Sequence, residues 1–168
     1  MITKDIRKSL KIRPSGRSSD FISPSFGWGC LYDCSYCYMK RHKPEGLSIA
    51  TNTNQILTEI NTHAVFAKHE VEKPNQTHSK YLTYDISCNE DFALHAKHHE
   101  WEKIFDFFKY HDDILGTFAT KYVNNELLKY NPKEKIRIRF SMMPENKRQI
   151  HEPNTSTILE RIQAIDKF

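Results

Sequence analysis

The chain has 168 residues, of which 38% are hydrophobic and 27% charged, so a disordered composition is excluded and one ordinary globular core is possible. No apolar run approaches the roughly 18 residues that span a bilayer, and the basic start lacks the apolar block of a signal peptide. We therefore expect a cytoplasmic protein without membrane contact. Four cysteines, three of them within eight residues, favour a ligand cluster over a disulfide framework.

The net charge of +4 is uneven along the chain. Residues 1–45 carry nine Lys and Arg against four Asp and Glu, and they include the three clustered cysteines. Pro14, Gly16 and several serines predict a basic N-terminal arm over residues 1–20, and residues 21–168 are expected to form one core. Positive charge beside a site suggests an anionic partner such as phosphate or nucleic acid, and a merely solvated arm is the alternative.

Strands and helices alternate after this arm. The segment DFISPSF at 20–26 predicts a short strand, although Pro24 restricts it to a strand end. The cysteine loop follows, and the next segment predicts a helix over 51–70 with Thr53 as its N-cap. Further along, the sequence predicts strands at 80–87, 116–120 and 135–142 and helices at 98–110, 124–130 and 155–168.

Several of these elements have periodic patterns. The helix at 98–110 has apolar residues at i, i+3, i+4 and i+7, namely Trp101, Ile104, Phe105 and Phe108. The last strand alternates apolar residues with arginines, and the last helix has an apolar face made of Ile158, Ile162 and Ile165. The histidine-rich HAKHH at 95–99 predicts a polar loop and the start of the next helix, with a metal-binding tract as the alternative.

The order of these elements predicts an α/β fold with a parallel sheet covered by helices. Right-handed crossovers then place the carboxyl ends of the strands on one rim, where α/β proteins build their sites. Each of the four predicted strands is followed by a polar residue: Cys30, Cys88, Lys121 and Ser141. We expect these four side chains to face a common opening at this rim of the sheet.

The cysteine loop has the spacing C-x3-C-x2-C, formed by Cys30, Cys34 and Cys37. Three thiolates can bind three irons of a [4Fe–4S] cluster and leave the fourth iron open, whereas most such clusters have four cysteine ligands. The alternative is a Cys3His zinc module with His42 as the fourth ligand. Small zinc modules are usually independent loops or hairpins, so a position after the first strand of an alternating chain favours the iron–sulfur cluster.

With Tyr36 before the last cysteine, the motif resembles that of the radical S-adenosylmethionine superfamily. The stretch SPSFGWGCLYDCSYCYMK, which contains Tyr36 and Tyr38, is similar to the spore photoproduct lyase family, and YDISCNED, FATKY and IRFSMM follow in that family's order. The resemblance implies a partial parallel (β/α) barrel with about four β/α units present. It also implies reductive cleavage of S-adenosylmethionine to a 5′-deoxyadenosyl radical.

The resemblance assigns roles to individual residues. Cys88 is implied as a hydrogen-atom donor, with Tyr36 and Tyr38 as further catalytic residues. Lys121 and Ser141 are implied contacts of S-adenosylmethionine. Where the family often has a serine two residues after the cysteine, this chain has Glu90, followed by Asp91, and both carboxylates are candidates to accept from ribose hydroxyls. The implied substrate is a pyrimidine dimer in DNA, and the implied reductant is a flavodoxin or ferredoxin.

Length is the largest departure from the family. A complete (β/α) barrel takes about 250 residues, and no fifth or sixth strand follows the last predicted helix. We interpret the chain as a fragment, or as a minimal protein that a partner chain completes. An open sheet edge can pair with another chain, so we expect the protein to oligomerise or to behave poorly when isolated. A catalytically inactive radical S-adenosylmethionine fragment is therefore a second alternative, besides the zinc module.

Overall fold

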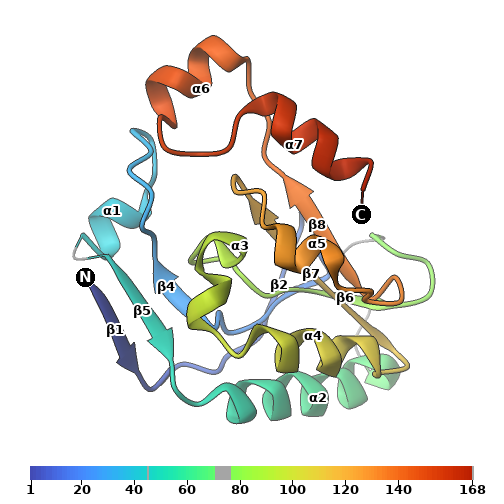
Figure 1. Ribbon diagram of the computed structural model, residues 1–168. Coiled ribbons are helices and arrows are strands. Elements are labelled where there is room, and N and C mark those ends of the chain that lie inside the picture. The colour runs from blue at the N-terminus through green and yellow to red at the C-terminus, as the bar shows by residue number, and fades with distance from the viewer. Residues whose placement is uncertain (45, 71–76, 168) are drawn as a thin grey trace.

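The larger sheet of the computed structural model, which describes residues 1–44, 46–70 and 77–167, has the strand order β2-β3-β6-β7-β8 (Figure 1). Its strands are β2 (Arg13–Pro14), β3 (Phe21–Ile22), β6 (Leu82–Asp85), β7 (Ile114–Thr120) and β8 (Ile136–Phe140). The last four pair in parallel in chain order, and β2 pairs antiparallel with β3 at the edge. The predicted α/β fold with a parallel sheet is confirmed.

Helices separate the parallel strands and cover the sheet. They are α2 (Thr53–Glu70), α3 (Phe92–His95), the 3-10 helix η1 (Ala96–His98), α4 (Trp101–Lys109), α5 (Asn125–Lys129), α6 (Glu145–His151) and α7 (Ile158–Ile165), besides the short α1 (Met39–His42). The helices α2 and α4 contact each other and lie side by side (Figure 1). Within the described ranges, no helix has the length and apolar character that crossing a membrane requires.

The core forms where α2 and α4 pack on the sheet. The apolar face that the sequence predicts for α4 is buried, since Ile104, Phe105 and Phe108 are 0% exposed. A Cβ atom at Gly116 of β7 would lie 3.0 Å from the Phe108 ring, so this glycine allows the helix its close approach. Phe92, just after β6, packs on β7 through Phe118. This packing fixes the carboxyl ends of β6 and β7, from which the candidate site is built.

A smaller sheet, with the order β1-β5-β4, was not predicted. The strand β1 (Ile2–Asp5) pairs in parallel with β5 (Leu47–Ala50), and β4 (Gly27–Gly29) pairs antiparallel with β5. The expectation of an irregular arm is therefore wrong for β1 and β2, because each pairs with a strand beyond residue 20. The division of the chain into residues 1–20 and 21–168 stays a prediction.

The cysteine loop begins one strand later than predicted. The strand β3 has only two residues, and β4 of the smaller sheet lies between it and Cys30. Gly29 ends β4 with a φ of 103°, and a Cβ atom there would clash with the carbonyl oxygen of Gly46. Only glycine adopts this conformation without strain, so Gly29 sets the direction in which the chain enters the loop.

The final helix buries a different face from the one its sequence suggests. Ile162 and Ile165 are 49% and 55% exposed, whereas Arg161 and Ala164 are buried. The helix starts at a capping box, in which the Thr157 hydroxyl accepts from the Glu160 backbone N–H and the Glu160 carboxylate accepts from the Thr157 backbone N–H. This cap and the buried Arg161, rather than the isoleucines, fix how α7 sits on the molecule.

Candidate functional site

One cavity, of about 420 Å³, brings together side chains from four parts of the chain. The cysteine loop contributes Cys30, Cys34, Cys37 and Tyr38. The segments after β6, β7 and β8 contribute Cys88, Lys121 and Ser141, and Glu90 also lines the cavity. Parallel strands explain this gathering, because their carboxyl ends meet at one edge of the sheet. Of the residues singled out in the sequence for catalysis or for ligand binding, Tyr36 and the alternative zinc ligand His42 do not line it.

The three loop cysteines suit an iron–sulfur cluster by their chemistry. All three are free thiols and line the same cavity, and Cys34 is buried. The turn between them is closed by the Cys37 backbone N–H, which donates to the Cys34 carbonyl. Burial raises the pKa of Cys30 to about 12 and also raises the pKa of Cys34. Soft thiolates are what iron–sulfur clusters require, and coordination deprotonates such thiols outright.

His42 does not line the cavity at these cysteines. It lines a neighbouring cavity with Tyr38 and Cys88, and its ring packs edge-on against Tyr38 with centroids 5.8 Å apart. In the part of the chain that the structure describes, no three His, Cys, Asp or Glu side chains are arranged around a single metal ion. The position of His42 therefore does not favour the Cys3His zinc alternative.

Cys88 and Tyr38 form one contact across the cavity. The Tyr38 hydroxyl donates to the Cys88 carbonyl oxygen at 2.8 Å, which joins the cysteine loop to the segment after β6. Burial, with a smaller contribution from Asp85, raises the pKa of Cys88. The thiol therefore keeps its proton at neutral pH. A protonated thiol is the form from which a hydrogen atom can be transferred.

Tyr36 points to a different partner. Its hydroxyl donates to a carboxylate oxygen of Glu152, just after α6, and its ring lies 5.8 Å from the ammonium of Lys121. Burial and the hydrogen bond to Glu152 raise the pKa of this phenol. The prediction that Tyr36 is catalytic stays a prediction, and the structure gives it an anionic partner that the sequence did not reveal.

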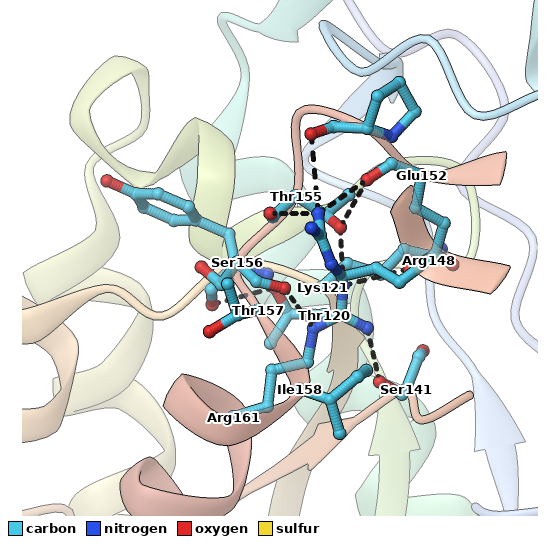
Figure 2. A network of polar contacts seen from close by, with 12 residues as sticks. Thr120, Lys121, Ser141, Arg148, Glu152, Thr155, Ser156, Thr157, Ile158 and Arg161 are labelled. Atoms are coloured by element: carbon cyan, nitrogen blue, oxygen red, sulfur yellow. Dashed lines mark hydrogen bonds and ion pairs between the residues drawn. The ribbon is translucent and has the colours of Figure 1, made fainter. Parts of the chain in front are cut away.

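Glu152 belongs to a buried polar network around Arg161 (Figure 2). The Arg161 guanidinium donates to the Glu152 carboxylate at 2.9 Å and to the Ser141 carbonyl at 2.6 Å. The Ser156 backbone N–H, in the loop before α7, donates to the Lys121 carbonyl. A single buried ion pair therefore links the segments that carry Tyr36, Lys121 and Ser141.

Asp91 also fixes the carboxyl end of β7, through hydrogen bonds to Thr120 and Lys121. Its carboxylate accepts from the Thr120 hydroxyl at 2.6 Å and from the Lys121 backbone N–H at 2.8 Å, and it also caps α3 through the Leu94 N–H. These bonds engage both oxygens, so Asp91 holds the backbone at Lys121 in place. The predicted contact of Asp91 with a ribose stays a prediction.

Glu90 lies in a buried cluster with two histidines. One carboxylate oxygen accepts from His95 Nδ1 at 3.2 Å and from His99 Nε2 at 2.8 Å, while the other is buried without a hydrogen-bond partner among the described residues. Burial raises its pKa, but the charges and hydrogen bonds of the histidines outweigh this and lower it to about 2. The expected polar loop at 95–99 is therefore wrong, since the His95 and His99 side chains are buried.

The same cluster reaches the cysteine loop. The Leu31 backbone N–H, next to Cys30, donates to His95 Nε2 at 3.3 Å. The same imidazole therefore contacts the cysteine loop through Nε2 and Glu90 through Nδ1. The cofactor-binding role assigned to Glu90 stays a prediction, and its observed partners join the Cys30 region to the segment after β6.

Sequence reasoning missed three charged residues of the site: Arg139, Glu152 and Arg161. Arg139 of β8 lines the cavity and pairs with Asp85 of β6 at 2.6 Å. The alternation of isoleucine and arginine in β8 was a usable signal, because it places the arginines on the face opposite the helices. Nothing local marks Glu152 and Arg161, since their partners come from distant parts of the chain.

Known proteins resemble the chain over almost all of its length. The model of the family described as spore photoproduct lyase matches residues 1–168. The spore photoproduct lyases of Bacillus subtilis (strain 168) and Geobacillus sp. (strain Y412MC61) are each 26% identical over 96% of this chain. The matched parts are 45% and 46% of those proteins, so the chain spans about half their length.

Solved structures share the fold. A spore photoproduct lyase complexed with a dinucleoside spore photoproduct matches with a TM-score of 0.79 and 22% identity, over 99% of this chain and 47% of that one. A variant with bound S-adenosylmethionine and the dinucleoside spore photoproduct matches with a TM-score of 0.80 and 21% identity, over the same shares of the two chains. The chain thus shares its α/β fold with these structures.

Proposed function

The chain belongs to the spore photoproduct lyase family, and from this premise we propose that it is a radical S-adenosylmethionine protein with lyase-like activity on pyrimidine dimers in DNA. One observation carries the proposal. The three cysteines of the loop and the residues that follow β6, β7 and β8 line a single cavity. A cluster ligand set, a candidate cofactor contact and a candidate hydrogen donor therefore face the same space.

The proposed cofactors are a [4Fe–4S] cluster, held by Cys30, Cys34 and Cys37, and S-adenosylmethionine. Together, and on reduction, they supply a 5′-deoxyadenosyl radical that can abstract a hydrogen atom. Lys121 offers a point positive charge for the carboxylate of S-adenosylmethionine. Ser141, at the end of β8, and the unpaired oxygen of Glu90 are the other proposed contacts.

Cys88 is the proposed hydrogen-atom donor. Its S–H bond is weak, so the thiol can return a hydrogen atom to a carbon radical of the product and become a thiyl radical. The Tyr38 hydroxyl lies against the Cys88 backbone and is the proposed next hydrogen donor. Tyr36 is the other proposed catalytic residue, and its hydroxyl is held by the hydrogen bond that it donates to Glu152.

The proposed partners follow from the same chemistry. DNA supplies the substrate, and a flavodoxin or ferredoxin supplies the electron. A second copy of the chain, or a completing partner chain, is proposed to cover the open edge of the sheet at β8. We also propose a cytoplasmic location, which suits an oxygen-sensitive cluster and free thiols.

The function is tested by anaerobic reconstitution with iron and sulfide, followed by reduction in the presence of S-adenosylmethionine and DNA that contains the dimer. We expect 5′-deoxyadenosine to form and the dimer to be repaired. Cys34→Ala is the matched negative variant, because it removes one proposed cluster ligand, and His42→Ala is the control for the zinc alternative.

The alternatives give different results. A zinc module is colourless and air-stable, and it loses its metal in His42→Ala. An inactive fragment assembles the cluster without forming 5′-deoxyadenosine or repairing the dimer. Formation of 5′-deoxyadenosine without dimer repair would keep the radical chemistry and reject the DNA substrate.

A further inference from the structure

Cationic side chains form a surface next to Cys88 that the proposed chemistry does not use. We call it the basic shelf and define it by Arg7, Lys11, Arg13 and Lys43. Two cavities lie along it, of about 290 and 470 Å³, and both are lined by Arg7, Arg13 and Asn89. The second is also lined by Tyr38 and Cys88, which line the cavity at the cysteines as well. The basic shelf is therefore continuous with the candidate site.

Arg7 is held in place on this shelf before any ligand binds. The Asn52 side chain accepts from the Arg7 backbone N–H at 2.8 Å and donates to its carbonyl at 3.1 Å. The guanidinium lies over the Trp28 ring, 5.3 Å from its centroid. Such a fixed guanidinium loses little conformational entropy when it binds an anion.

The charge of Arg7 is poorly compensated by the protein. Its Nε is buried and has no hydrogen-bond partner among the described residues. Burial and the neighbouring charge of Arg13 lower its pKa, and the charge of Glu90 offsets this only in part. A bound anion between the two guanidinium groups would raise the pKa of Arg7 again. It would accept a hydrogen bond from the buried Nε–H, and its negative charge would lie between the two like charges.

The residues of the basic shelf differ from three other arginines of the described chain in having no carboxylate partner. Elsewhere in the molecule Arg139, Arg148 and Arg161 each form an ion pair with Asp or Glu. Among the ion pairs formed within residues 1–44, 46–70 and 77–167, none involves a residue of the basic shelf. The cations beside Cys88 are thus left available to an outside anion.

We propose that Arg7 and Arg13 bind phosphodiester groups of the DNA strand whose lesion enters the cavity at Cys88. This assignment rests on the proposed function for its choice of DNA. Arginine forms two parallel hydrogen bonds to phosphate, and backbone phosphates are the anions that accompany any base presented to this cavity. Lys11 and Lys43 extend the positive surface along the strand.

The test measures DNA binding of the reconstituted chain by fluorescence anisotropy over a range of salt concentrations, with a labelled duplex as the probe. Each phosphate contact that is lost should reduce the slope of log K against log salt by about 0.9, so the double variant Arg7→Gln/Arg13→Gln should reduce it by about two. Its affinity at low salt should fall about tenfold or more, because hydrogen bonds to charged groups are lost. Lys129→Gln removes the same charge far from the shelf and should leave the slope unchanged.

Arg13→Gln alone guards against a folding artefact, because Arg13 is exposed on the edge strand β2 and its loss does not disturb the core. It should reduce the slope by about one. Equal slopes for the wild type and both arginine variants overturn the assignment. Tighter binding of an RNA duplex of the same sequence overturns DNA as the occupant.

These results are separable from the proposed function. A wild type with a spectrum that responds to S-adenosylmethionine, but without salt-dependent DNA binding, overturns the phosphate site and leaves the radical chemistry standing. Salt-dependent binding that requires both arginines, in a chain without such a spectrum, supports the phosphate site and removes only the cofactor chemistry.

Discussion

At the scale of single residues, Cys88 has the properties that a hydrogen-atom donor needs. Its thiol lines the cavity beside the loop cysteines, and burial keeps it protonated by raising its pKa. The hydroxyl of Tyr38 lies against its backbone, so the proposed second hydrogen donor is next to it. Cys88 can therefore be the donor while the three loop cysteines remain the cluster ligands.

Cys88→Ala should separate cleavage of the cofactor from repair of the substrate. The variant keeps the three loop cysteines, so 5′-deoxyadenosine should still form, but the yield of repaired dimer for each 5′-deoxyadenosine should fall about tenfold, equivalent to about 1.4 kcal/mol of transition-state stabilisation. Chromatography of both products from one reaction gives this ratio. An unchanged ratio would remove Cys88 from the mechanism.

Glu90 provides a test based on pH. Its folded pKa of about 2 lies below its ordinary value of 4.5, because two histidines stabilise its charge against the cost of burial. A lowered folded pKa contributes stability above the unfolded value, and this contribution is lost as the pH falls towards the folded one. Glu90→Gln should therefore destabilise the metal-free chain most at neutral pH, and progressively less between pH 4.5 and 2.

Urea unfolding at neutral pH and below pH 4.5 measures this difference in the free energy of unfolding. Glu126→Gln, on the exposed first turn of α5, is the matched control and should show a much smaller effect. A destabilisation of Glu90→Gln that is equally large at both pH values would contradict the assigned ion cluster.

At the scale of elements, the loop between α6 and α7 acts as a brace for the site. Arg161 of α7 pairs with Glu152 in the interior and also holds the Ser141 carbonyl, as Figure 2 shows. The carbonyl of His151, the last residue of α6, accepts from the Ser35 backbone N–H, so the end of α6 supports the cysteine loop. The arrangement of the site residues therefore depends on the Arg161–Glu152 ion pair, which lies outside the cavity.

Glu152→Gln should destabilise the chain by about 3 kcal/mol, because it leaves the charge of Arg161 buried without its counter-ion. The variant should also loosen Tyr36, whose hydroxyl donates to the same carboxylate. Urea unfolding gives the first effect, and the fluorescence of the tyrosines reports the second. Glu102→Gln, on the exposed side of α4, serves as the control. A loss of less than about 1 kcal/mol, which is typical of surface pairs, would show that the pair contributes little.

The elements that the sequence predicted well are those with local signals. The helix α4 has a full apolar face, and the strand β8 alternates isoleucine with arginine, so periodicity alone identifies both. The strands β1 and β5 were missed because each has four residues and their pairing joins Ile2 to Leu47, far apart in the chain. All four residues of β5 are buried, so it has no alternation to detect.

The candidate site was predictable for a different reason. The carboxyl ends of parallel strands must meet, so Cys88, Lys121 and Ser141 could be placed together once the strands were found. The partners of Glu90 and Tyr36 could not, because His99 and Glu152 reach them only through the packing of helices and loops. Sequence patterns locate the ends of elements, whereas the contacts of charged side chains depend on tertiary structure.

At the scale of the whole molecule, the chain holds a complete candidate cluster loop and the strand ends around it, within about half the length of its curated relatives. The larger sheet has β8 at one edge, and the last helix keeps Ile162 and Ile165 exposed. We infer that this portion assembles a cluster with an iron open to S-adenosylmethionine.

Electron paramagnetic resonance of the anaerobically reconstituted and reduced chain, with and without S-adenosylmethionine, tests that claim most directly. We expect a [4Fe–4S]⁺ signal that changes on addition of the cofactor and is lost in Cys34→Ala. A chain that takes up one tightly bound zinc instead, or a cluster whose spectrum ignores S-adenosylmethionine, would contradict it.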